Sequence, residues 1–240
     1  HHPHCGFDNL IRLGIHRRVT LEKVLMLVPE QVRQVIETYA PDEIYNLAGQ
    51  SSVGKSFDMP AQTFDSIAVA TLYLLEAVRD LNIPVKFFNA GSGDCYGDQG
   101  GRPVTETDSF DPKSPYAIAK ATALQHVDTF REAYGLFACT GILFNHESFL
   151  RPPWFVTRKI VNTALDIAGG RSSELVLGDI SIRRDWGWAP EYVDAMWRML
   201  QQAEPEDYII ATGTGISLAE FVDAVFTRLG LDRHRHVRTD

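Results

Sequence analysis

The chain has 240 residues, of which 45% are hydrophobic and 22% charged, and this composition is typical of a folded globular protein with one large domain or two small ones. Acidic residues outnumber Lys and Arg by 31 to 23, and the resulting formal net charge of −8 disfavours broad nucleic-acid binding, which relies on a basic surface. The three cysteines are scattered, which predicts a protein without disulfides in a reducing cytoplasm. The sequence has no uncharged apolar run near the roughly 18 residues that cross a bilayer, and no signal-peptide pattern, so it predicts no membrane span and no secretion.

The first predicted feature is the His/Cys run at residues 1–5 (HHPHC), which is a tag remnant or frayed end rather than a metal site, because no second ligand cluster follows it. Apolar periodicity then predicts helices over residues 28–40, 60–81, 115–134, 154–168, 191–203 and 218–229. Short apolar runs predict strands over residues 43–48, 85–90, 137–144, 175–177 and 208–211, with loops over 91–113 and 145–153. This alternation predicts an α/β fold with a doubly wound parallel sheet, because nearly continuous apolar strands need helices on both faces.

Tyr116 and Lys120 are the first candidate catalytic pair. They are spaced four residues apart near the start of a predicted helix, so both project from one face. A nearby ammonium favours the phenolate and lowers the pKa of a tyrosine, so the pair predicts a hydroxyl acid/base that works closer to neutral pH. The same spacing also occurs by chance on ordinary exposed helices.

Ser92 and Asp94 strengthen the catalytic interpretation. They follow the strand VKFFNA, and ligands of parallel α/β sheets bind at the carboxyl ends of the strands. A hydroxyl and a carboxylate therefore precede the Tyr–Lys helix by one loop. Asp94 could instead be an ordinary turn residue, a role in which aspartate is common.

Several further segments, taken in order, make the pattern specific. The chain carries NLAGQS at residues 46–51, GILFNHES at 141–148, FVTRKI at 155–160, RDWG at 184–187 and IATG at 210–213. Together with the Ser, Asp, Tyr and Lys positions they resemble the GDP-mannose 4,6-dehydratase family, in the extended, nucleotide-sugar-modifying branch of the short-chain dehydrogenases/reductases. The resemblance covers nearly the whole chain from Asn9 onward. It implies a Rossmann-like core over residues 1–150 and, interleaved with that core, a smaller and mainly substrate-binding region over residues 151–240.

The resemblance also implies a lyase reaction within nucleotide-sugar metabolism and GDP-fucose biosynthesis. NADP, with NAD as a possible substitute, would take a hydride from C4 of GDP-mannose or a close GDP-hexose. Water would leave across C5 and C6, and the hydride would return to C6 to give a GDP-4-keto-6-deoxy sugar. Tyr116 would accept the O4 proton and Lys120 would hold the nicotinamide ribose. Ser92 would hydrogen-bond O4, and Asp94 would remove the C5 proton.

The same resemblance implies contacts with both ligands. Cofactor contacts would come from Ala48, Tyr116, Lys120, Leu143, Asn145, His146 and Arg151. Substrate contacts would come from Ser92, Asn145, Lys159 and Arg184. Arg184 would pair with the diphosphate, because a guanidinium fork suits two phosphate oxygens. From the residues alone, His146 could equally be a structural histidine, and Arg184 part of a solvated charge pair. No metal is implied, and the family's assemblies imply a homodimer or homotetramer paired through the helices over 60–81 and 115–134.

The sequence departs from the family in three respects. Asp94 stands where the family has Glu, and Ser92 where it has Thr, so the carboxylate is one methylene shorter. No glycine-rich phosphate-binding turn precedes Asn9, and the family's later segment that holds the GDP end is absent from the 240 residues. We therefore expect the first βαβ unit to be missing from this chain and the chain to be part of a longer one.

Two alternatives to the dehydratase remain open at this stage. A related GDP-sugar epimerase or reductase would not need Asp94. A catalytically inactive family member, acting as a binding subunit, would account for the missing glycine-rich turn, whereas the retention of Ser92, Tyr116 and Lys120 argues against it.

Overall fold

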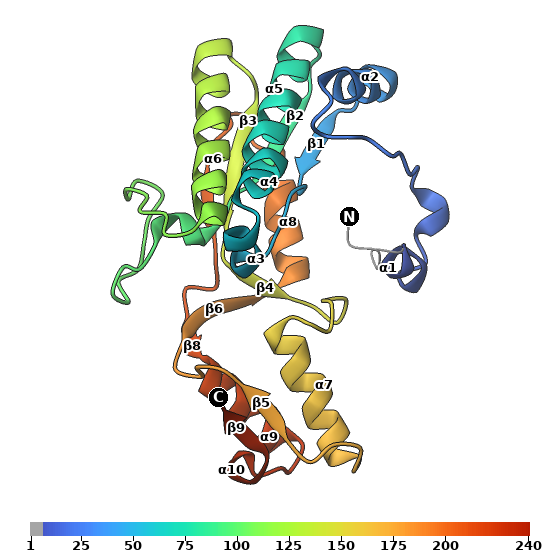
Figure 1. Ribbon diagram of the computed structural model, residues 1–240. Coiled ribbons are helices and arrows are strands. Elements are labelled where there is room, and N and C mark those ends of the chain that lie inside the picture. The colour runs from blue at the N-terminus through green and yellow to red at the C-terminus, as the bar shows by residue number, and fades with distance from the viewer. Residues whose placement is uncertain (1–6) are drawn as a thin grey trace.

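Four parallel strands form the main sheet of the protein, which a computed structural model describes over residues 7–240 (Figure 1). The strand order is β1-β2-β3-β7, with bounds Glu43–Asn46, Lys86–Ala90, Ala138–Leu143 and Tyr208–Ile210. All three neighbouring pairs are parallel, which confirms the parallel sheet expected from the sequence. The His/Cys run at residues 1–5 lies outside the described residues.

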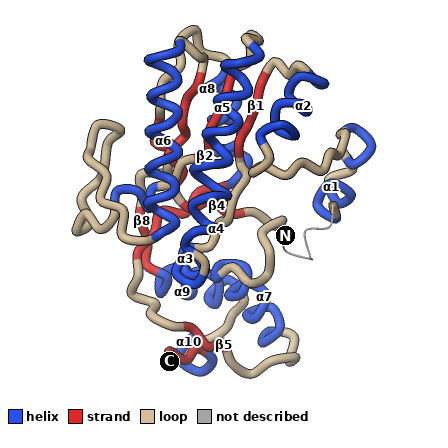
Figure 2. The backbone as a smooth tube through the Cα atoms, turned by 45° about the horizontal axis from the view of Figure 1, so that its top comes forward, coloured by secondary structure: helices blue, strands red, loops and turns tan. Residues whose placement is uncertain are grey.

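Helices cover both faces of this sheet, as a doubly wound fold requires (Figure 2). The helices are α1 (Asp8–Arg12), α2 (Pro29–Tyr39), α3 (Val53–Asp58), α4 (Pro60–Phe64), α5 (Ala70–Leu81), α6 (Pro115–Tyr134), α7 (Val156–Ala168), α8 (Ala189–Leu200), α9 (Leu218–Arg228) and α10 (Arg233–His236). Phe87 and Phe88 show the two faces, because successive strand residues point to opposite sides. Phe87 packs in the cluster that α2, α5 and α6 share, and Phe88 packs with residues of α8. Within the described residues, none of the helices has the length and apolar character that a membrane crossing requires.

The helix α6 carries the Tyr–Lys pair, and its ends are fixed by local sequence. The Ser114 hydroxyl accepts a hydrogen bond from the Ala117 amide at 3.1 Å, and Pro115 occupies the first turn, where a missing N–H costs nothing. Gly135 ends the helix with φ +67°, a conformation that glycine adopts without strain. The structure therefore confirms the expected helix over 115–134.

The helix expected over 60–81 is interrupted. The structure divides it into α4, a π-helical turn over Asp65–Val69, and α5. Apolar spacing predicted the buried face correctly but could not reveal the wider turn, because the apolar residues of α5 keep ordinary helical spacing among themselves. The expected starts of two other helices were also displaced, since α7 begins at Val156 and α8 at Ala189.

Two small sheets lie beyond the main one. One has the order β4-β6-β8, with bounds Asn145–Glu147, Arg183–Trp188 and Gly215–Ser217, and the other pairs β5 (Leu175–Leu177) with β9 (Val237–Thr239). The expected loop over 145–153 is thus wrong at its start, and β6 was not predicted because its RRDWGW sequence is polar. A separate apolar cluster from α7, β5 and α9 forms the lower part of the molecule, below these strands in Figure 1.

An arginine on α6 joins that helix to the sheet. Arg131 donates to both carboxylate oxygens of Asp207, at 3.0 and 3.2 Å, and to the Ala138 carbonyl at 3.0 Å. It also contacts Asp128 one turn earlier on the helix. Burial, together with the neighbouring Asp207, raises the pKa of Asp128 to about 6.

Asp128 gives a prediction about stability and pH. Because the folded-state pKa of this acid is raised, the folded chain binds more protons than the unfolded chain between about pH 4 and 6, so this group makes stability fall as pH rises through that window. Asp128→Asn is expected to make stability depend less on pH across that window. At pH 7 the free energy of unfolding should be equal or slightly higher, by less than about 1 kcal/mol, because the side chain is 38% exposed and screened by solvent. Thermal melts from pH 4 to 8 would check this, with Asp194→Asn, in an exposed ion pair, as control. A steeper slope in the Asp128 variant would contradict it.

Candidate active site

The carboxyl ends of β1, β2 and β3 lie at the same edge of the main sheet. Asn46, the last residue of β1, is in register with Asn89, which is in register with Thr140, and β3 continues to Leu143, so the segments after β1 and β2 begin beside the last residues of β3. Ala48 follows β1 and is exposed, as a residue lining a ligand cleft must be. The sequence expectation that functional residues follow NLA, FFNA and ILF thus corresponds to one continuous edge.

Ser92 and Asp94 lie in a tight turn directly after β2. Residues Gly93–Tyr96 form a 3-10 turn, and the Ser92 hydroxyl caps it by accepting a hydrogen bond from the Asp94 amide at 3.3 Å. The same hydroxyl donates to the Asp94 carboxylate at 3.3 Å. Ser92 is buried whereas Asp94 is exposed, so the carboxylate remains open to solvent while it contacts the serine. Asp94 therefore holds a turn position and is also placed beside the hydroxyl that the site requires.

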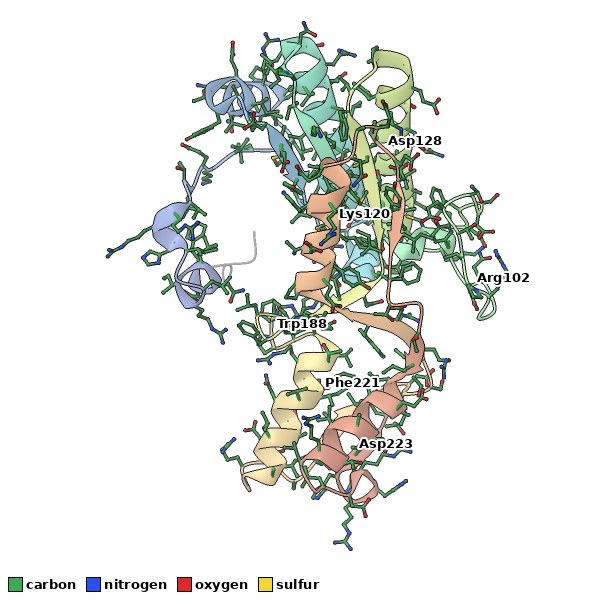
Figure 3. The ribbon with its side chains drawn as sticks, turned by 180° about the vertical axis from the view of Figure 1, so that it is seen from behind. Arg102, Lys120, Asp128, Trp188, Phe221 and Asp223 are labelled. Carbon is green, nitrogen blue, oxygen red and sulfur yellow. The ribbon has the colours of Figure 1, made fainter. Side chains whose placement is uncertain are left out.

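Lys120 is buried against the sheet, with 8% of its surface exposed. Its ammonium donates to the carbonyl of Ala90, the last residue of β2, at 2.7 Å. Burial lowers the pKa of Lys120 to about 8. Figure 3 shows the side chain within the upper part of the molecule, beside the sheet.

Tyr116 lies one turn before Lys120, and its environment differs from the expectation. Burial raises the pKa of Tyr116 to about 12; hydrogen bonding to Ser92 and the charge of Arg151 oppose this rise, and the charge of Asp94 adds to it. The expected lowering by Lys120 is wrong for this structure. The reason is geometric: the Lys120 ammonium is 5.9 Å from the centre of the Tyr116 ring and is hydrogen-bonded to Ala90 instead.

The segment after β3 carries several of the expected ligand contacts. Leu143 ends β3, and Asn145 and His146 begin β4, with Asn145 exposed and His146 half-buried. The His146 Nδ1 atom lies 2.9 Å from the Phe144 carbonyl. Arg151 follows in the next loop, where its guanidinium lies 3.3 Å from Glu147. Because Arg151 also influences Tyr116 electrostatically, this loop faces the same side of the site.

Lys159 and Arg184 lie further from the turn after β2. Lys159, on α7, donates to the Val176 carbonyl at 2.6 Å, and Arg184, on β6, donates to the Arg183 carbonyl at 2.8 Å. Both side chains are exposed and keep further N–H groups for an anionic ligand. The Lys159 contact joins α7 to β5, and the Arg184 contact is to the preceding residue of β6, so neither contact reaches Ser92 or Tyr116.

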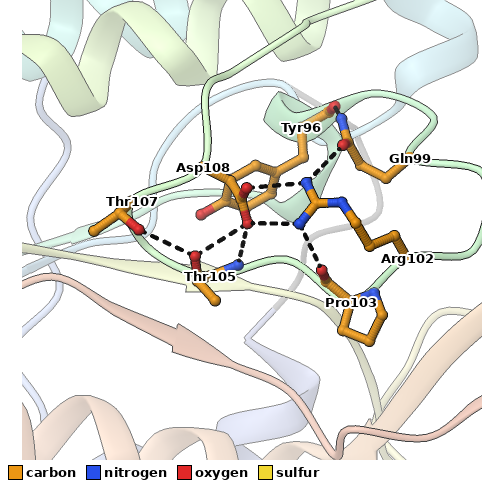
Figure 4. Close-up of polar contacts among 7 residues, drawn as sticks. All are labelled: Tyr96, Gln99, Arg102, Pro103, Thr105, Thr107 and Asp108. Carbon is orange, nitrogen blue, oxygen red and sulfur yellow. Dashed lines mark hydrogen bonds and ion pairs between the residues drawn. The ribbon is translucent and has the colours of Figure 1, made fainter.

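The loop between the turn and α6 is held in one conformation by its own polar contacts (Figure 4). Arg102 pairs with both carboxylate oxygens of Asp108, at 2.9 and 3.2 Å, and lowers the pKa of Asp108 to about 2. Glu106 accepts a hydrogen bond from the Ile209 amide of β7 at 2.8 Å, which ties the loop to the sheet. Gly97 begins the loop with φ +66°, where a side chain would lie 2.3 Å from the Asp111 carbonyl oxygen. The loop therefore fixes the spacing between Ser92 and Tyr116.

Two features of the site were not found from the sequence. Asn46, Asn89 and Thr140 form a buried hydrogen-bonded row across β1, β2 and β3, and the Asn46 side chain also accepts from the Ala48 amide at 3.3 Å. The available signal was a polar residue in each of the three strands, at the end of β1, one residue before the end of β2 and in the middle of β3. Tyr192, on α8, stacks on His146, and nothing in the local sequence around it signals that contact.

Comparison with protein families identifies the chain. Residues 7–239 match the family model described as GDP-mannose 4,6 dehydratase. The chain belongs to the GDP-mannose 4,6-dehydratase family. It is 47% identical over 213 residues to GDP-mannose 4,6 dehydratase 2 of Arabidopsis thaliana, an alignment that covers 87% of this chain and 57% of the relative. It is 46% identical over 202 residues to the Dictyostelium discoideum enzyme, covering 83% of this chain and 57% of that relative.

Members of the wider fold confirm the architecture of this dehydratase-family chain. The RMD protein of Pseudomonas aeruginosa, solved with NADPH, superposes with a TM-score of 0.81 at 24% identity, covering 91% of this chain and 77% of that one. DesIV of Streptomyces venezuelae, a dTDP-glucose 4,6-dehydratase solved with NAD and TYD, gives a TM-score of 0.86 at 21% identity. The match covers 98% of this chain and 71% of DesIV. The chain spans 57% of the length of the Arabidopsis relative named above, a little over half. Among residues 7–240, no group of three or more His, Cys, Asp or Glu side chains is placed to hold a metal ion.

Proposed function

We propose that the protein is a nucleotide-sugar dehydratase, a lyase that converts GDP-mannose or a close GDP-hexose to the GDP-4-keto-6-deoxy sugar. The observation that carries the proposal is the meeting of Ser92, Asp94, Tyr116 and Lys120 at the carboxyl edge of the sheet. A serine beside a carboxylate and a half-buried tyrosine supplies the separate proton acceptors that oxidation at C4 and elimination across C5 and C6 need. The chain's membership of the dehydratase family supports the same reaction.

The residues fit the nicotinamide end of NADP, with NAD as the second possibility. Tyr116 and Lys120 lie in the first turns of α6, where Lys120 contacts the end of β2. The other proposed contacts end or follow the neighbouring strands β1 and β3, and they are Ala48, Leu143, Asn145, His146 and Arg151. A bound nicotinamide would supply the hydride acceptor for C4 and the hydride donor for C6. The solved relatives with NADPH and with NAD support a nicotinamide cofactor without separating the two.

The chain's own groups then act on the sugar. Ser92 hydrogen-bonds O4, and Tyr116 takes the O4 proton as the C4–H bond is oxidised. Once C4 is a ketone the C5 proton becomes acidic, and Asp94 removes it and passes a proton to the departing C6 hydroxyl, which leaves as water. When hydride adds to C6, C5 takes up a proton, which balances the proton that Tyr116 took from O4. Asp94 contacts the Ser92 hydroxyl at 3.3 Å, so the proposed C5 base lies beside the proposed O4 contact.

Exposed polar and cationic side chains are proposed to bind the nucleotide of the substrate. Asn145, Lys159 and Arg184 are the proposed contacts, with the Arg184 fork on the diphosphate. The proposed division is a cofactor core over residues 1–150, of which residues 7–150 are described, and a mainly substrate-binding region over 151–240. The two are interleaved, because α8 and β7 pack on the core sheet while α7 and α9 build the lower cluster.

Asp94 discriminates the dehydratase from a related epimerase or reductase. Asp94→Asn is expected to lower the rate at which GDP-mannose loses water, when it is incubated with the protein and NADP, by about 10²- to 10⁴-fold. The reason is that the amide cannot accept the C5 proton. Mass spectrometry of the sugar nucleotide would measure the loss of one water, with Asp98→Asn, on the neighbouring loop, as the matched control.

Two outcomes of this experiment would replace the proposal. C4 redox activity that is unchanged in Asp94→Asn, with no dehydration by either protein, would favour the epimerase or reductase. No product from the unaltered protein, together with no bound nucleotide, would favour an inactive binding subunit.

We also propose that the protein pairs with a second copy, as a homodimer or within a homotetramer. A shallow, largely apolar groove of about 450 Å³ lies between α4 and the start of α6, lined by Pro60, Ala61, Phe64, Asp65, Pro115 and Ile118. Phe64 and Ile118 are exposed there, at 36% and 48%. Burying such a face against its own copy fits a self-complementary two-fold interface.

The proposed setting is the cytoplasm, where the product would enter GDP-fucose biosynthesis. Cys95 and Cys139 are free and buried, which suits a reducing compartment. No nucleic acid or membrane partner is proposed.

A further inference from the structure

The proton on the His146 ring is fixed by its backbone partner. Nδ1 lies 2.9 Å from the Phe144 carbonyl oxygen, and a carbonyl oxygen can only accept a hydrogen bond. Nδ1 therefore carries the proton, and in the neutral ring Nε2 is an acceptor. His146 is half-buried at the carboxyl edge of the sheet, so an acceptor with a defined direction stands where the nucleotide is proposed to bind.

The ring of His146 is held from the side by Tyr192 of α8. The two ring centres are 4.7 Å apart and the planes are inclined by 28°, which is a stacked arrangement. Tyr192 is only 3% exposed and lies in the cluster that packs α8 on the sheet. Its position is thus set by the core rather than by solvent or by the ligand.

The strand next to β4 leaves room for this stack. Gly187 of β6 is in register with His146, and a β-carbon at Gly187 would lie 2.2 Å from the Tyr192 ring. Any side chain there would displace Tyr192. The glycine is therefore required by the stacking partner of His146.

The hydroxyl of Tyr192 shows what the residue contributes. It is buried and has no hydrogen-bond partner among the described residues, an arrangement that costs free energy. Since the hydroxyl makes no polar contact, the ring itself, packed flat on His146, is the part of Tyr192 that the site uses.

We propose that Tyr192 and Gly187 are positioning residues that hold His146 so that its Nε2 accepts a hydrogen bond from a hydroxyl or amide N–H of the bound nicotinamide nucleotide. The proposal rests on the proposed function, because it needs that nucleotide. Neither positioning residue touches the reacting atoms; both act through His146.

The experiment compares Tyr192→Leu, Tyr192→Phe and Gly187→Ala with the unaltered protein. Nitrogen-15 NMR of the histidine rings at about pH 8.5, above the ordinary histidine range, reports which ring nitrogen carries the proton, and His146→Gln assigns the signal. Titration with NADP gives the dissociation constant. Tyr192→Phe keeps the stack and is expected to match the unaltered protein in both measurements.

Tyr192→Leu and Gly187→Ala are expected to lose the single-tautomer signal of His146 and to bind NADP about tenfold more weakly, the effect of one misaligned hydrogen bond. The turnover of bound substrate should change less than the dissociation constant. An unchanged His146 signal and unchanged NADP binding in Tyr192→Leu would overturn the proposal. If the unaltered protein itself binds no NADP, the proposed function fails, whereas the NMR comparison in the free protein still decides whether Tyr192 and Gly187 position the ring.

Discussion

Tyr116→Phe is expected to lower turnover of the proposed reaction by about 10²- to 10⁴-fold, the range that a positioned acid/base contributes. The phenylalanine ring can keep the packing of Tyr116 against Ile67 and the alanines of α6, so the fold should remain intact. The loss would appear in the rate of water elimination from GDP-mannose, measured with saturating NADP. Tyr134→Phe, at the exposed end of the same helix, is the control and should leave the rate unchanged.

The raised pKa of Tyr116 also predicts how the rate of the proposed reaction depends on pH. Burial raises the pKa of Tyr116 to about 12, so the fraction of phenolate rises about tenfold per pH unit below that value. The rate at low substrate, kcat/KM, is therefore expected to climb between about pH 6 and 9 in the unaltered protein and to lose this slope in Tyr116→Phe. A variant that retains both the rate and the slope would remove Tyr116 from the mechanism.

Much of the fold was predictable from periodicity, for reasons visible in particular elements. Ser114 and Pro115 mark the start of α6 and Gly135 marks its end. The apolar run around Phe87 and Phe88 predicts β2. The strand β6 was not predictable, because Arg183–Trp188 is polar and half-exposed and is held as a strand by its neighbours β4 and β8. Strand pairing of this kind depends on long-range contacts that local sequence does not encode.

The candidate site, like the fold, was only partly predictable from the sequence. The positions of Ser92, Asp94, Tyr116 and Lys120 followed from strand ends and helical spacing, and the structure brings them to one edge. Their electrostatics did not follow, because spacing alone cannot say that the Lys120 ammonium binds the Ala90 carbonyl or that burial dominates the pKa of Tyr116. Tyr192 also escaped prediction, since it reaches the site from the far face of the sheet.

Lys120→Met is expected to abolish activity and yet to stabilise the fold. Burial lowers the pKa of Lys120 to about 8 from its ordinary 10.5, a difference that corresponds to about 3 kcal/mol against the folded, protonated state at pH 7. Methionine has a similar length and no charge to desolvate, but it gives up the hydrogen bond to Ala90. The expected net gain is about 1 to 2 kcal/mol, or a rise of roughly 2–8 °C in melting temperature.

The pH dependence separates this cause from simple repacking. Between about pH 8 and 10.5 the unfolded lysine holds a proton that the folded one releases, so the unaltered protein gains stability as pH rises and the advantage of Lys120→Met shrinks. Lys86→Met is the matched control, because Lys86 also donates to a backbone carbonyl, that of Leu200 at 2.6 Å, but is only half-buried, so its loss should destabilise. If Lys120→Met is less stable than the unaltered protein at pH 7, the buried ammonium does not lower the free energy of unfolding, and the prediction is wrong. Stabilisation together with loss of activity would instead mean that the buried charge of Lys120 is needed for the reaction and lowers the stability of the fold.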